Sequence, residues 1–244
     1  MTTTDQWSTW AIEQHVVRPV ATSQSCDLCF GAVGYRSDGI PFQRCNHCDS
    51  YPRALDTYVP ICSSLDDGLE SLLHRYKDFG VQYRWMAAPL TSLLKDFLER
   101  HLPCLEARSG RLHVATIVPS GNDGRAFDHL RDAIRLIDDW PIRWTFDLIG
   151  KAKSGRPERG VIDPTFYRAG QAAPSGIGVL LVDDTWTSGS TLISAAMCLR
   201  GRGLPRIAGL TIGRQLHAGF GNSEQLIDQV TRTQFDMNTC ALER

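Results

Sequence analysis

Short apolar runs alternate with segments of helical periodicity along most of the chain. Between Leu65 and Tyr76 the apolar residues recur at the spacing of one helix face. Similar patterns predict further helices beginning near Pro89, around 127–137 and over 190–200. The apolar runs indicate strands at 57–62, 111–121, 143–150, 179–182 and 206–213. Strands that alternate with helices are typical of a parallel sheet covered on both faces, so the pattern predicts an α/β fold.

Two stretches lack a sustained apolar period. Residues 1–25 contain Trp7 and Trp10, and they fit either a short helix or a loose tail. Residues 151–177 are rich in Gly, Pro, Lys and Arg. A structureless stretch of that length inside a compact domain is usually a functional lid or a disordered connection. At the first periodic segment, by contrast, Ser64 and Asp67 resemble a capping box, which predicts that a helix starts there.

Four of the eight cysteines form two closely spaced pairs. This spacing fits a zinc ribbon, in which four thiolates hold one tetrahedral ion, and the predicted ligands are Cys26, Cys29, Cys45 and Cys48. The alternative is two unrelated redox or structural pairs. We expect an N-terminal segment at 1–25, the zinc ribbon at 26–50 and a larger domain at 51–244. Because residues 49–56 form only a short link, we expect the ribbon to pack against that domain.

Charge and composition narrow the classes of partner. The 244 residues carry a formal net charge of −1, so no overall field draws the chain to nucleic acid or to acidic membrane surfaces. No apolar run approaches the roughly 18 residues of a membrane-spanning helix. The stretch MTTTDQWSTW lacks the basic and apolar regions of a signal peptide. We therefore expect a cytoplasmic protein with no membrane partner, and assembly into a homo-oligomer is left open.

The stretch VLLVDDTWTSGST contains the strongest candidate for chemistry. Four apolar residues end in Asp183 and Asp184, and ligands bind at the carboxyl ends of strands in open parallel sheets. The following turn then enters a helix through Thr187, Ser188, Gly189, Ser190 and Thr191. Backbone N–H groups and hydroxyls at a helix start form a phosphate cradle. Carboxylates that bind a diol beside such a cradle indicate a ribose 5-phosphate site, although the acids could instead simply cap the helix.

This stretch resembles the signature of the type I phosphoribosyltransferases, which bind phosphoribosyl pyrophosphate (PRPP). The resemblance implies a Rossmann-like core with a parallel sheet and a mechanism in which a nucleophile displaces pyrophosphate from PRPP. It also implies Mg²⁺ bridging the pyrophosphate and the ribose hydroxyls, with Asp183 and Asp184 as the catalytic acids. Thr187 stands where hypoxanthine-type enzymes commonly place an aspartate, which argues against a hypoxanthine-like acceptor. The bulky Trp186 either stacks on the substrate or points into a neighbouring helix.

Nearly the whole chain resembles the ComF family of bacterial phosphoribosyltransferase-like proteins, which are named for a role in DNA uptake. The shared order is a cysteine zinc module, a helix ending in HRYKDFG, and the acidic motif near the C-terminus. The resemblance implies that Lys77, Ser120 and Gly121 contact the pyrophosphate. It also matches the family's mobile loop to residues 156–168. Further candidates to meet pyrophosphate are Lys151, Lys153, Arg156 and Arg159.

Three classes of function are compatible with these features. The first is an active PRPP-dependent transferase whose acceptor is unknown. The second is a protein that binds PRPP or a nucleotide without turnover. The third is an accessory factor whose zinc ribbon binds single-stranded DNA or another protein. In this third class Phe30, Tyr35 and Phe42 could stack bases, or they could form the small core of the ribbon. His113, which precedes the pyrophosphate loop, is expected to be structural.

Overall fold

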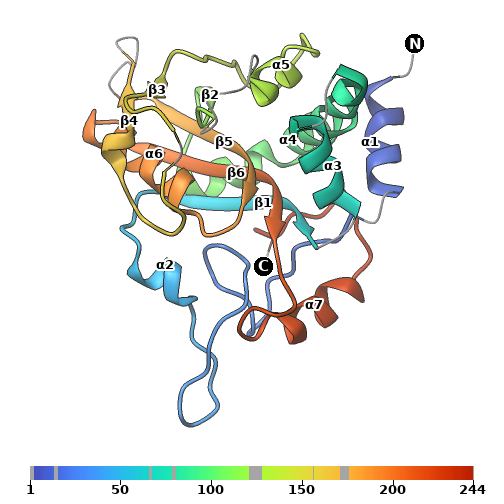
Figure 1. Ribbon diagram of the computed structural model, residues 1–244, viewed down its shortest axis with the longest axis vertical. Helices are drawn as coiled ribbons and strands as arrows, with labels where there is room; N and C mark the ends of the chain where they lie inside the picture. The colour runs from blue at the N-terminus through green and yellow to red at the C-terminus, as the bar shows by residue number, and fades with distance from the viewer. Residues whose placement is uncertain are drawn as a thin grey trace.

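A four-stranded parallel sheet lies at the centre of the molecule (Figure 1). The computed structural model describes residues 3–13, 16–65, 68–78, 81–120, 128–155, 157–170 and 176–243. The sheet has the order β1-β6-β5-β2, and every pairing in it is parallel. Its strands are β1 (Thr57–Ser64), β2 (Val114–Ile117), β5 (Gly178–Trp186) and β6 (Arg206–Gln215). The α/β prediction is confirmed.

Helices cover both faces of the sheet. α4 (Ala87–Ser109) lies on the path from β1 to β2, and α6 (Ser190–Gly201) connects β5 to β6. The two connections run in opposite directions across the sheet, so right-handed crossovers place their helices on opposite faces. Figure 1 shows α4 passing behind the sheet and α6 in front of it. Residues Val179 to Val182 of β5 are each 0% exposed, which explains their uninterrupted apolar run.

Shorter elements complete the fold. They are α1 (Thr4–Glu13), α2 (Asn46–Ser50), α3 (Gly68–Asp78), η1 (Val81–Met86), α5 (His129–Ile134), η2 (Pro164–Phe166) and α7 (Ser223–Thr231), with β3 (Ile149–Lys151) and β4 (Tyr167–Ala169) forming an antiparallel pair. Of the two interpretations of the N-terminal segment, the helix is correct for Thr4–Glu13. α1 packs on α4, and Trp7, Trp10 and Trp85 form a cluster of rings at its surface. None of the helices in the described ranges is long and apolar enough to span a bilayer.

The predicted capping box is wrong. Ser64 belongs to β1, where it is buried and aligned with Gln215 of β6. α3 starts at Gly68, four residues after Ser64, so the Ser64 side chain is too far from the first turn to cap it. Asp67 lies outside the described residues. β1 extends beyond the predicted strand at 57–62 because Ser63 and Ser64 still pair with β6.

The strand predicted at 143–150 is mostly absent. Trp144 makes a single parallel bridge to Ala115, and regular pairing resumes only at Ile149 in β3. The chain leaves the main sheet after that bridge in order to form the separate hairpin of β3 and β4. The apolar residues of a partly exposed connecting segment therefore resemble a strand in the sequence. The helix predicted around 127–137 is shorter than expected, His129–Ile134, and Phe127 lies outside the described residues.

Within residues 151–177, the described part is not structureless. Residues 157–170 dock on α6, where the Gly160 N–H donates to Ser190 Oγ at 3.2 Å and the Asp163 N–H donates to Ser194 Oγ at 2.9 Å. Residues 156 and 171–175 lie outside the described ranges. The segment therefore covers the helix that begins at the predicted cradle.

The cysteine-rich segment, residues 26–50, packs on the sheet, as expected from the short link at residues 49–56. Phe30, Val33 and Cys48 are each 2% exposed or less and belong to the same buried cluster as the residues of β5. Figure 1 shows this segment wrapping beneath the sheet, next to α7. Of the aromatic residues that could stack bases, Phe30 is thus part of the core, whereas Phe42 is 42% exposed. The segment and the sheet share one core.

Replacing Phe30 should therefore destabilise the whole protein. We expect Phe30→Ala to lower the free energy of unfolding by about 3–5 kcal/mol, because it leaves a cavity between the cysteine-rich segment and the sheet. Phe42→Ala, in the same segment but exposed, should change it by no more than about 0.5 kcal/mol. Urea denaturation followed by tryptophan fluorescence measures both. Equal effects of the two substitutions would contradict the shared core.

Candidate functional site

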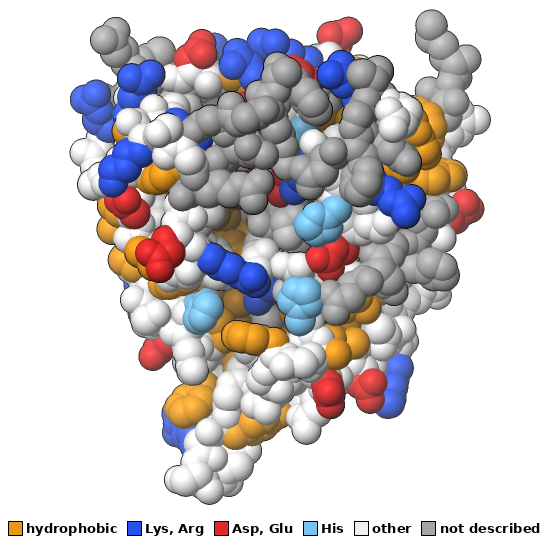
Figure 2. Space-filling model, viewed as in Figure 1, with side chains coloured by type: hydrophobic (Ala, Val, Ile, Leu, Met, Phe, Trp, Pro, Cys, Tyr) orange, Lys and Arg blue, Asp and Glu red, His pale blue; other side chains and the backbone are white. Residues whose placement is uncertain are grey.

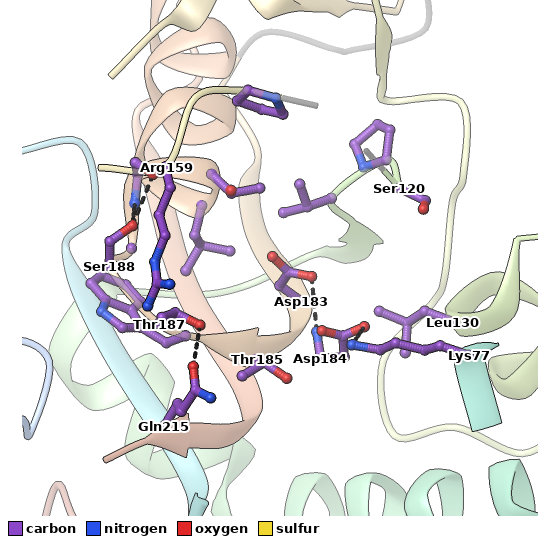
Figure 3. Close-up of a pocket in the computed structure, with 18 of the residues that line it drawn as sticks. Lys77, Ser120, Leu130, Arg159, Asp183, Asp184, Thr185, Thr187, Ser188 and Gln215 are labelled. Carbon is purple, nitrogen blue, oxygen red and sulfur yellow. Dashed lines mark hydrogen bonds and ion pairs between the residues drawn. The ribbon is translucent and has the colours of Figure 1, made fainter. Parts of the chain in front are cut away.

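A cavity of 510 Å³ opens at the carboxyl ends of the parallel strands. Its walls include Asp183 and Asp184 among the last residues of β5 before Trp186, Ser120 after β2, Gln215 at the end of β6 and the turn that starts α6. Figure 3 shows these side chains around one space, with Lys77 of α3 beside Asp184. This edge is where ligands bind in open parallel sheets. The structure therefore brings the predicted acids and the predicted cradle together.

Asp184 is surrounded by hydrogen-bond donors. Its Oδ2 lies 2.6 Å from Lys77 Nζ and 3.1 Å from His129 Nε2, and it accepts a bond from the Tyr76 hydroxyl at 3.4 Å. Burial alone would raise the pKa of Asp184, but the Lys77 ammonium and the His129 ring hold it well below its usual range. Asp184 is therefore a fixed anion whose charge is already compensated by protein groups.

Asp183 has a different environment. It is half-buried on the cavity wall, and its Oδ1 accepts the backbone N–H of Asp184 at 2.9 Å. Figure 3 shows its carboxyl group pointing into the open space. Burial and the neighbouring Asp184 carboxylate raise the pKa of Asp183 to about 8. A cation or hydroxyl donors placed in the cavity would favour its charged form, so Asp183 is the acid that a ligand can engage.

The turn between β5 and α6 has the form of an anion cradle. Gly189 has φ of +85°, and a Cβ at this position would lie 2.1 Å from the Trp186 ring, so only glycine fits. The hydroxyls of Ser188 and Ser190 are 3.0 Å apart, and both residues line the cavity with Thr191. The N-terminus of α6 adds backbone N–H groups to these hydroxyls, an arrangement that suits a phosphate group.

The Thr187 side chain points away from this cradle toward β6. Its hydroxyl donates to Gln215 Oε1 at 2.8 Å (Figure 3). Trp186 is 2% exposed, and its ring packs on that of Tyr58 with 4.2 Å between centroids. The Trp186 ring therefore packs on a strand residue of β1 rather than on a neighbouring helix, and its burial argues against stacking on a substrate. The tryptophan supports the turn from beneath and is not positioned to stack on a ligand.

The remaining predicted basic residues divide into two groups. Arg159 lines the cavity together with Lys77. Lys151 donates to the Gly155 carbonyl and Lys153 pairs with Asp163 at 2.8 Å, and neither lysine lines the cavity. Gly121 and Arg156 lie outside the described residues. His113 accepts the Gly178 N–H at 2.9 Å between two strands, which supports its structural assignment.

Sequence reasoning missed four contributors to this region. They are Tyr76, His129, Arg214 and Gln215. Only their contacts reveal them, because they come from three separate elements, α3, α5 and β6, and none has a motif of its own. The one available signal was for Tyr76, which directly precedes the predicted Lys77.

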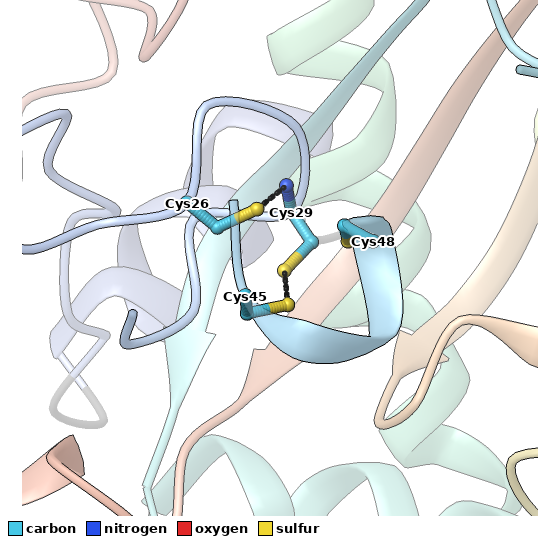
Figure 4. Close-up of side chains that lie close together, drawn as sticks. All are labelled: Cys26, Cys29, Cys45 and Cys48. Atoms are coloured by element: carbon cyan, nitrogen blue, oxygen red, sulfur yellow. Dashed lines mark hydrogen bonds between the residues drawn. The ribbon is translucent and has the colours of Figure 1, made fainter. Parts of the chain in front are cut away.

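The four cysteines of the two CxxC pairs converge, as predicted (Figure 4). Their sulfur atoms all lie within 4.8 Å of one another, and Cys29 Sγ is 3.7 Å from Cys45 Sγ. Hydrogen bonds from Cys26, Cys45 and Cys48 lower the pKa of the Cys29 thiol well below its usual value. Four sulfurs at this spacing match the ligand set of a tetrahedral structural site. The cluster could therefore bind a metal such as zinc, and the alternative of two unrelated pairs is not what the structure shows.

Arg214 joins this cysteine cluster to the cradle. Its Nε donates to the Cys29 carbonyl at 2.8 Å, and its Nη2 lies 3.6 Å from Cys29 Sγ. On the other side, its Nη1 donates to the carbonyls of Trp186 and Thr187 at 3.3 and 3.2 Å. The side chain is buried, and a Cβ at Gly31 would lie 2.1 Å from its Nη2. One guanidinium thus fixes the position of a cysteine ligand relative to the cradle turn.

A second cavity of 600 Å³ lies between the cysteine-rich segment and the cradle. Its walls include apolar groups of Val33, Leu216 and Phe220, and it shares Thr187 and Gln215 with the first cavity. Arg159 also lines both cavities, and His47 and His217 line the second. Figure 2 shows lysine, arginine and histidine side chains gathered around the hollowed centre of this face. The two adjoining cavities thus combine a part lined by hydroxyls and charged groups with a more apolar part.

No protein-family model matches this chain, and no curated protein matches it. The resemblance to phosphoribosyltransferases therefore depends on the motif residues and on the geometry around them. That geometry establishes a parallel α/β sheet with an acidic, hydroxyl-rich cavity at its carboxyl edge and a four-cysteine cluster beside it.

The raised pKa of Asp183 predicts a stability that depends on pH. The folded state holds this proton up to about pH 8, whereas an unfolded aspartate releases it near pH 4. The folded state therefore binds more protons in this window, so the contribution of Asp183 to stability falls as pH rises through it. Asp183→Asn should raise Tm more at pH 8 than at pH 5, by about 2–4 °C for each kcal/mol regained.

Scanning calorimetry at the two pH values tests this expectation. Asp228→Asn is the control, because the Asp228 side chain on α7 is 72% exposed. A Tm difference between Asp183→Asn and the native protein that does not change with pH would contradict the raised pKa.

The Arg214 contacts predict that cradle and cluster are coupled. In zinc-loaded protein, Arg214→Lys should speed metal release by about 10-fold, because lysine keeps the charge but loses the fork that holds the Cys29 carbonyl and sulfur. Transfer of the metal to a chromophoric chelator measures the rate. Arg206→Lys, an exposed position on the same strand, should leave it unchanged.

Proposed function

We propose that this protein binds PRPP with a divalent cation and transfers its phosphoribosyl group to an acceptor, with release of pyrophosphate. The observation that carries the proposal is that Asp183, the cradle of Ser188 to Thr191 and Lys77 all line one cavity. A sugar with a phosphate at one end and a pyrophosphate at the other needs those three kinds of group. On this proposal the sheet is the core of a type I phosphoribosyltransferase, and the chain is similar to the ComF family.

The chemical groups on each wall of the cavity indicate which part of PRPP would bind there. The N–H groups and hydroxyls at the start of α6 suit the 5-phosphate, and the cavity-facing Asp183 suits the ribose hydroxyls. Lys77 and Ser120 lie at the side of the cavity where the pyrophosphate would then extend, and Arg159 lines the same cavity. The compensated Asp184 holds Lys77 in place through their 2.6 Å ion pair.

In this reaction the bond between C1 of the ribose and the pyrophosphate oxygen breaks, and its electron pair leaves with the pyrophosphate. A lone pair of the acceptor forms the new bond to C1, and the acceptor loses a proton. The protein positions the reacting groups and stabilises the charge that develops on them. Mg²⁺ would neutralise charge on the pyrophosphate. The cavity's carboxyl oxygens, above all those of Asp183, are the donor type that this ion prefers.

The adjoining 600 Å³ cavity is the proposed acceptor site. It is reached past Thr187 and Gln215, and it is lined by Val33, Leu216 and Phe220. These groups suit a flat, partly apolar acceptor. Thr187 does not supply a general base at neutral pH, which agrees with an acceptor unlike hypoxanthine. Cys29, Val33 and Cys45 line this cavity, so the segment around the four cysteines forms one wall of the proposed acceptor site.

A second candidate function rests on the tip of the cysteine-rich segment. Ile40 and Phe42 are 52% and 42% exposed, and the Arg36 guanidinium lies 5.9 Å from the Phe42 ring centroid. An exposed aromatic ring beside an arginine is a group on which unpaired bases stack. In this role the protein would act as an accessory factor that binds single-stranded DNA or a protein, with or without catalysis.

Calorimetric titration with PRPP and Mg²⁺ tests the main proposal. The native protein should bind, and Asp183→Asn with Asp184→Asn should bind at least about 10-fold more weakly, because charge-assisted contacts are lost. Asp228→Asn, an exposed carboxylate on α7, is the matched control. Release of pyrophosphate with a panel of aromatic acceptors then separates transfer from binding alone. A folded native protein that gives no heat with PRPP would overturn the proposal and favour the second candidate.

A further inference from the structure

A second cluster of metal-ligating side chains lies apart from both cavities, between α4 and the segment that follows α7. His101 and Cys104 come from α4, and Cys240 comes from the C-terminal segment. One ligand atom from each lies within 4.8 Å of the other two. His101 and Cys240 are 2% and 1% exposed, so two of the three donors are buried. Glu243 reaches the same group from the C-terminal segment.

The distances among the His101, Cys104 and Glu243 atoms match one coordination sphere, and Cys240 Sγ lies within 4.8 Å of the His101 and Cys104 ligand atoms. His101 Nδ1 lies 3.6 Å from Cys104 Sγ and 3.6 Å from Glu243 Oε1, and Cys104 Sγ lies 3.3 Å from that same Oε1. A tetrahedral zinc ion with bonds of about 2.0–2.3 Å places neighbouring ligand atoms roughly 3.3–3.8 Å apart. The three measured separations fall in that range, as does the 3.7 Å between Cys29 and Cys45 in the other cluster.

The histidine is already oriented for ligation. His101 Nε2 lies 2.7 Å from the Met237 carbonyl, which can only accept, so Nε2 carries the ring proton. Nδ1 then has its lone pair directed toward Cys104 and Glu243. A backbone carbonyl that fixes the far nitrogen is the usual support for a metal-bound histidine. This contact also joins α4 to the C-terminal segment.

The turn that supplies the other two donors resembles the first cysteine knuckle. The Leu242 N–H donates to Cys240 Sγ at 3.4 Å, as the Cys29 N–H does to Cys26 Sγ at 3.5 Å. The Cys240 N–H donates to Glu243 Oε2 at 3.1 Å, which leaves Oε1 facing the histidine and Cys104. In both turns, two residues separate the donors, and a backbone amide supports a sulfur.

We propose that His101, Cys104, Cys240 and Glu243 bind a second zinc ion, which fastens the C-terminal segment to α4. Two thiolates favour a borderline-soft ion over Mg²⁺ or Ca²⁺, and one nitrogen and one carboxylate complete a tetrahedral set. A disulfide between Cys104 and Cys240 would use two of the four groups. It would not account for the orientation of His101 Nδ1 and the Glu243 carboxylate toward the same point. The site is independent of PRPP binding and of the four-cysteine cluster.

Metal analysis of the full chain, purified with reductant and extra zinc and then desalted, tests this site. The native protein should contain about two zinc ions per chain when the four-cysteine cluster is also loaded. Cys240→Ser should remove about one zinc per chain whatever the occupancy of that cluster. Cys198→Ser, a half-buried thiol on α6, should remove none. A zinc content that Cys240→Ser does not change would overturn the proposal.

Glu243→Gln provides a second test, because its 46% exposed side chain can be changed without disturbing the core. We expect this substitution to speed the release of one zinc ion by about 10-fold while circular dichroism stays unchanged. Release kinetics identical to those of the native protein would contradict Glu243 as a ligand. Metal-free native protein is also treated with reductant and zinc and its intact mass is measured. A Cys104–Cys240 disulfide that persists after this treatment would overturn the site.

Discussion

The buried charge at the end of β5 is the constraint on which this molecule's site depends. The strand is enclosed on both faces up to Val182, and Asp183 and Asp184 follow directly. A carboxylate placed there must be compensated, because an unpaired buried charge costs several kcal/mol. Lys77 from α3 and His129 from α5 supply that compensation to Asp184. The requirement therefore brings two helices to the same edge of the sheet, and the space they leave becomes the cavity.

The two aspartates illustrate a tension between stability and ligand binding. Asp184 is held ionised by its partners, whereas burial and the charge on Asp184 raise the pKa of Asp183 to about 8. An acid in that state opposes folding near neutral pH, yet it is poised to accept a cation or hydroxyl donors. Sites that act on charged ligands commonly retain such unfavourable groups. The position of Asp183 is therefore better explained by a ligand than by the fold.

The cysteine cluster is part of the same construction. Arg214 contacts the Cys29 carbonyl and sulfur on one side and the carbonyls of Trp186 and Thr187 on the other. Because the guanidinium is buried and rigid, movement of the cysteine knuckle is transmitted to the turn that precedes the cradle. A metal bound to the four cysteines would thus affect the cradle turn and the second cavity as well as the stability of its own segment. The cluster of His101, Cys104, Cys240 and Glu243 would act similarly on α4 and the C-terminal segment.

The sequence by itself determined the local features whose physical signals are contiguous. The α/β alternation, the buried run of β5, the acids at its end, the glycine turn into α6 and the paired cysteines were all apparent from residues close together in the chain. Apolar pattern failed where tertiary pairing decides the outcome. Ser64 belongs to a strand because β6 pairs with it, and residues 143–150 leave the sheet to form a separate hairpin. Only the tertiary structure brought Tyr76, His129, Arg214 and Gln215 to the site and set His101 beside Cys240. Those contacts join segments that are far apart in the chain, so the periodicity of the sequence does not predict them. Charged groups and metal ligands interact with whatever lies near them in space, whatever its position in the sequence.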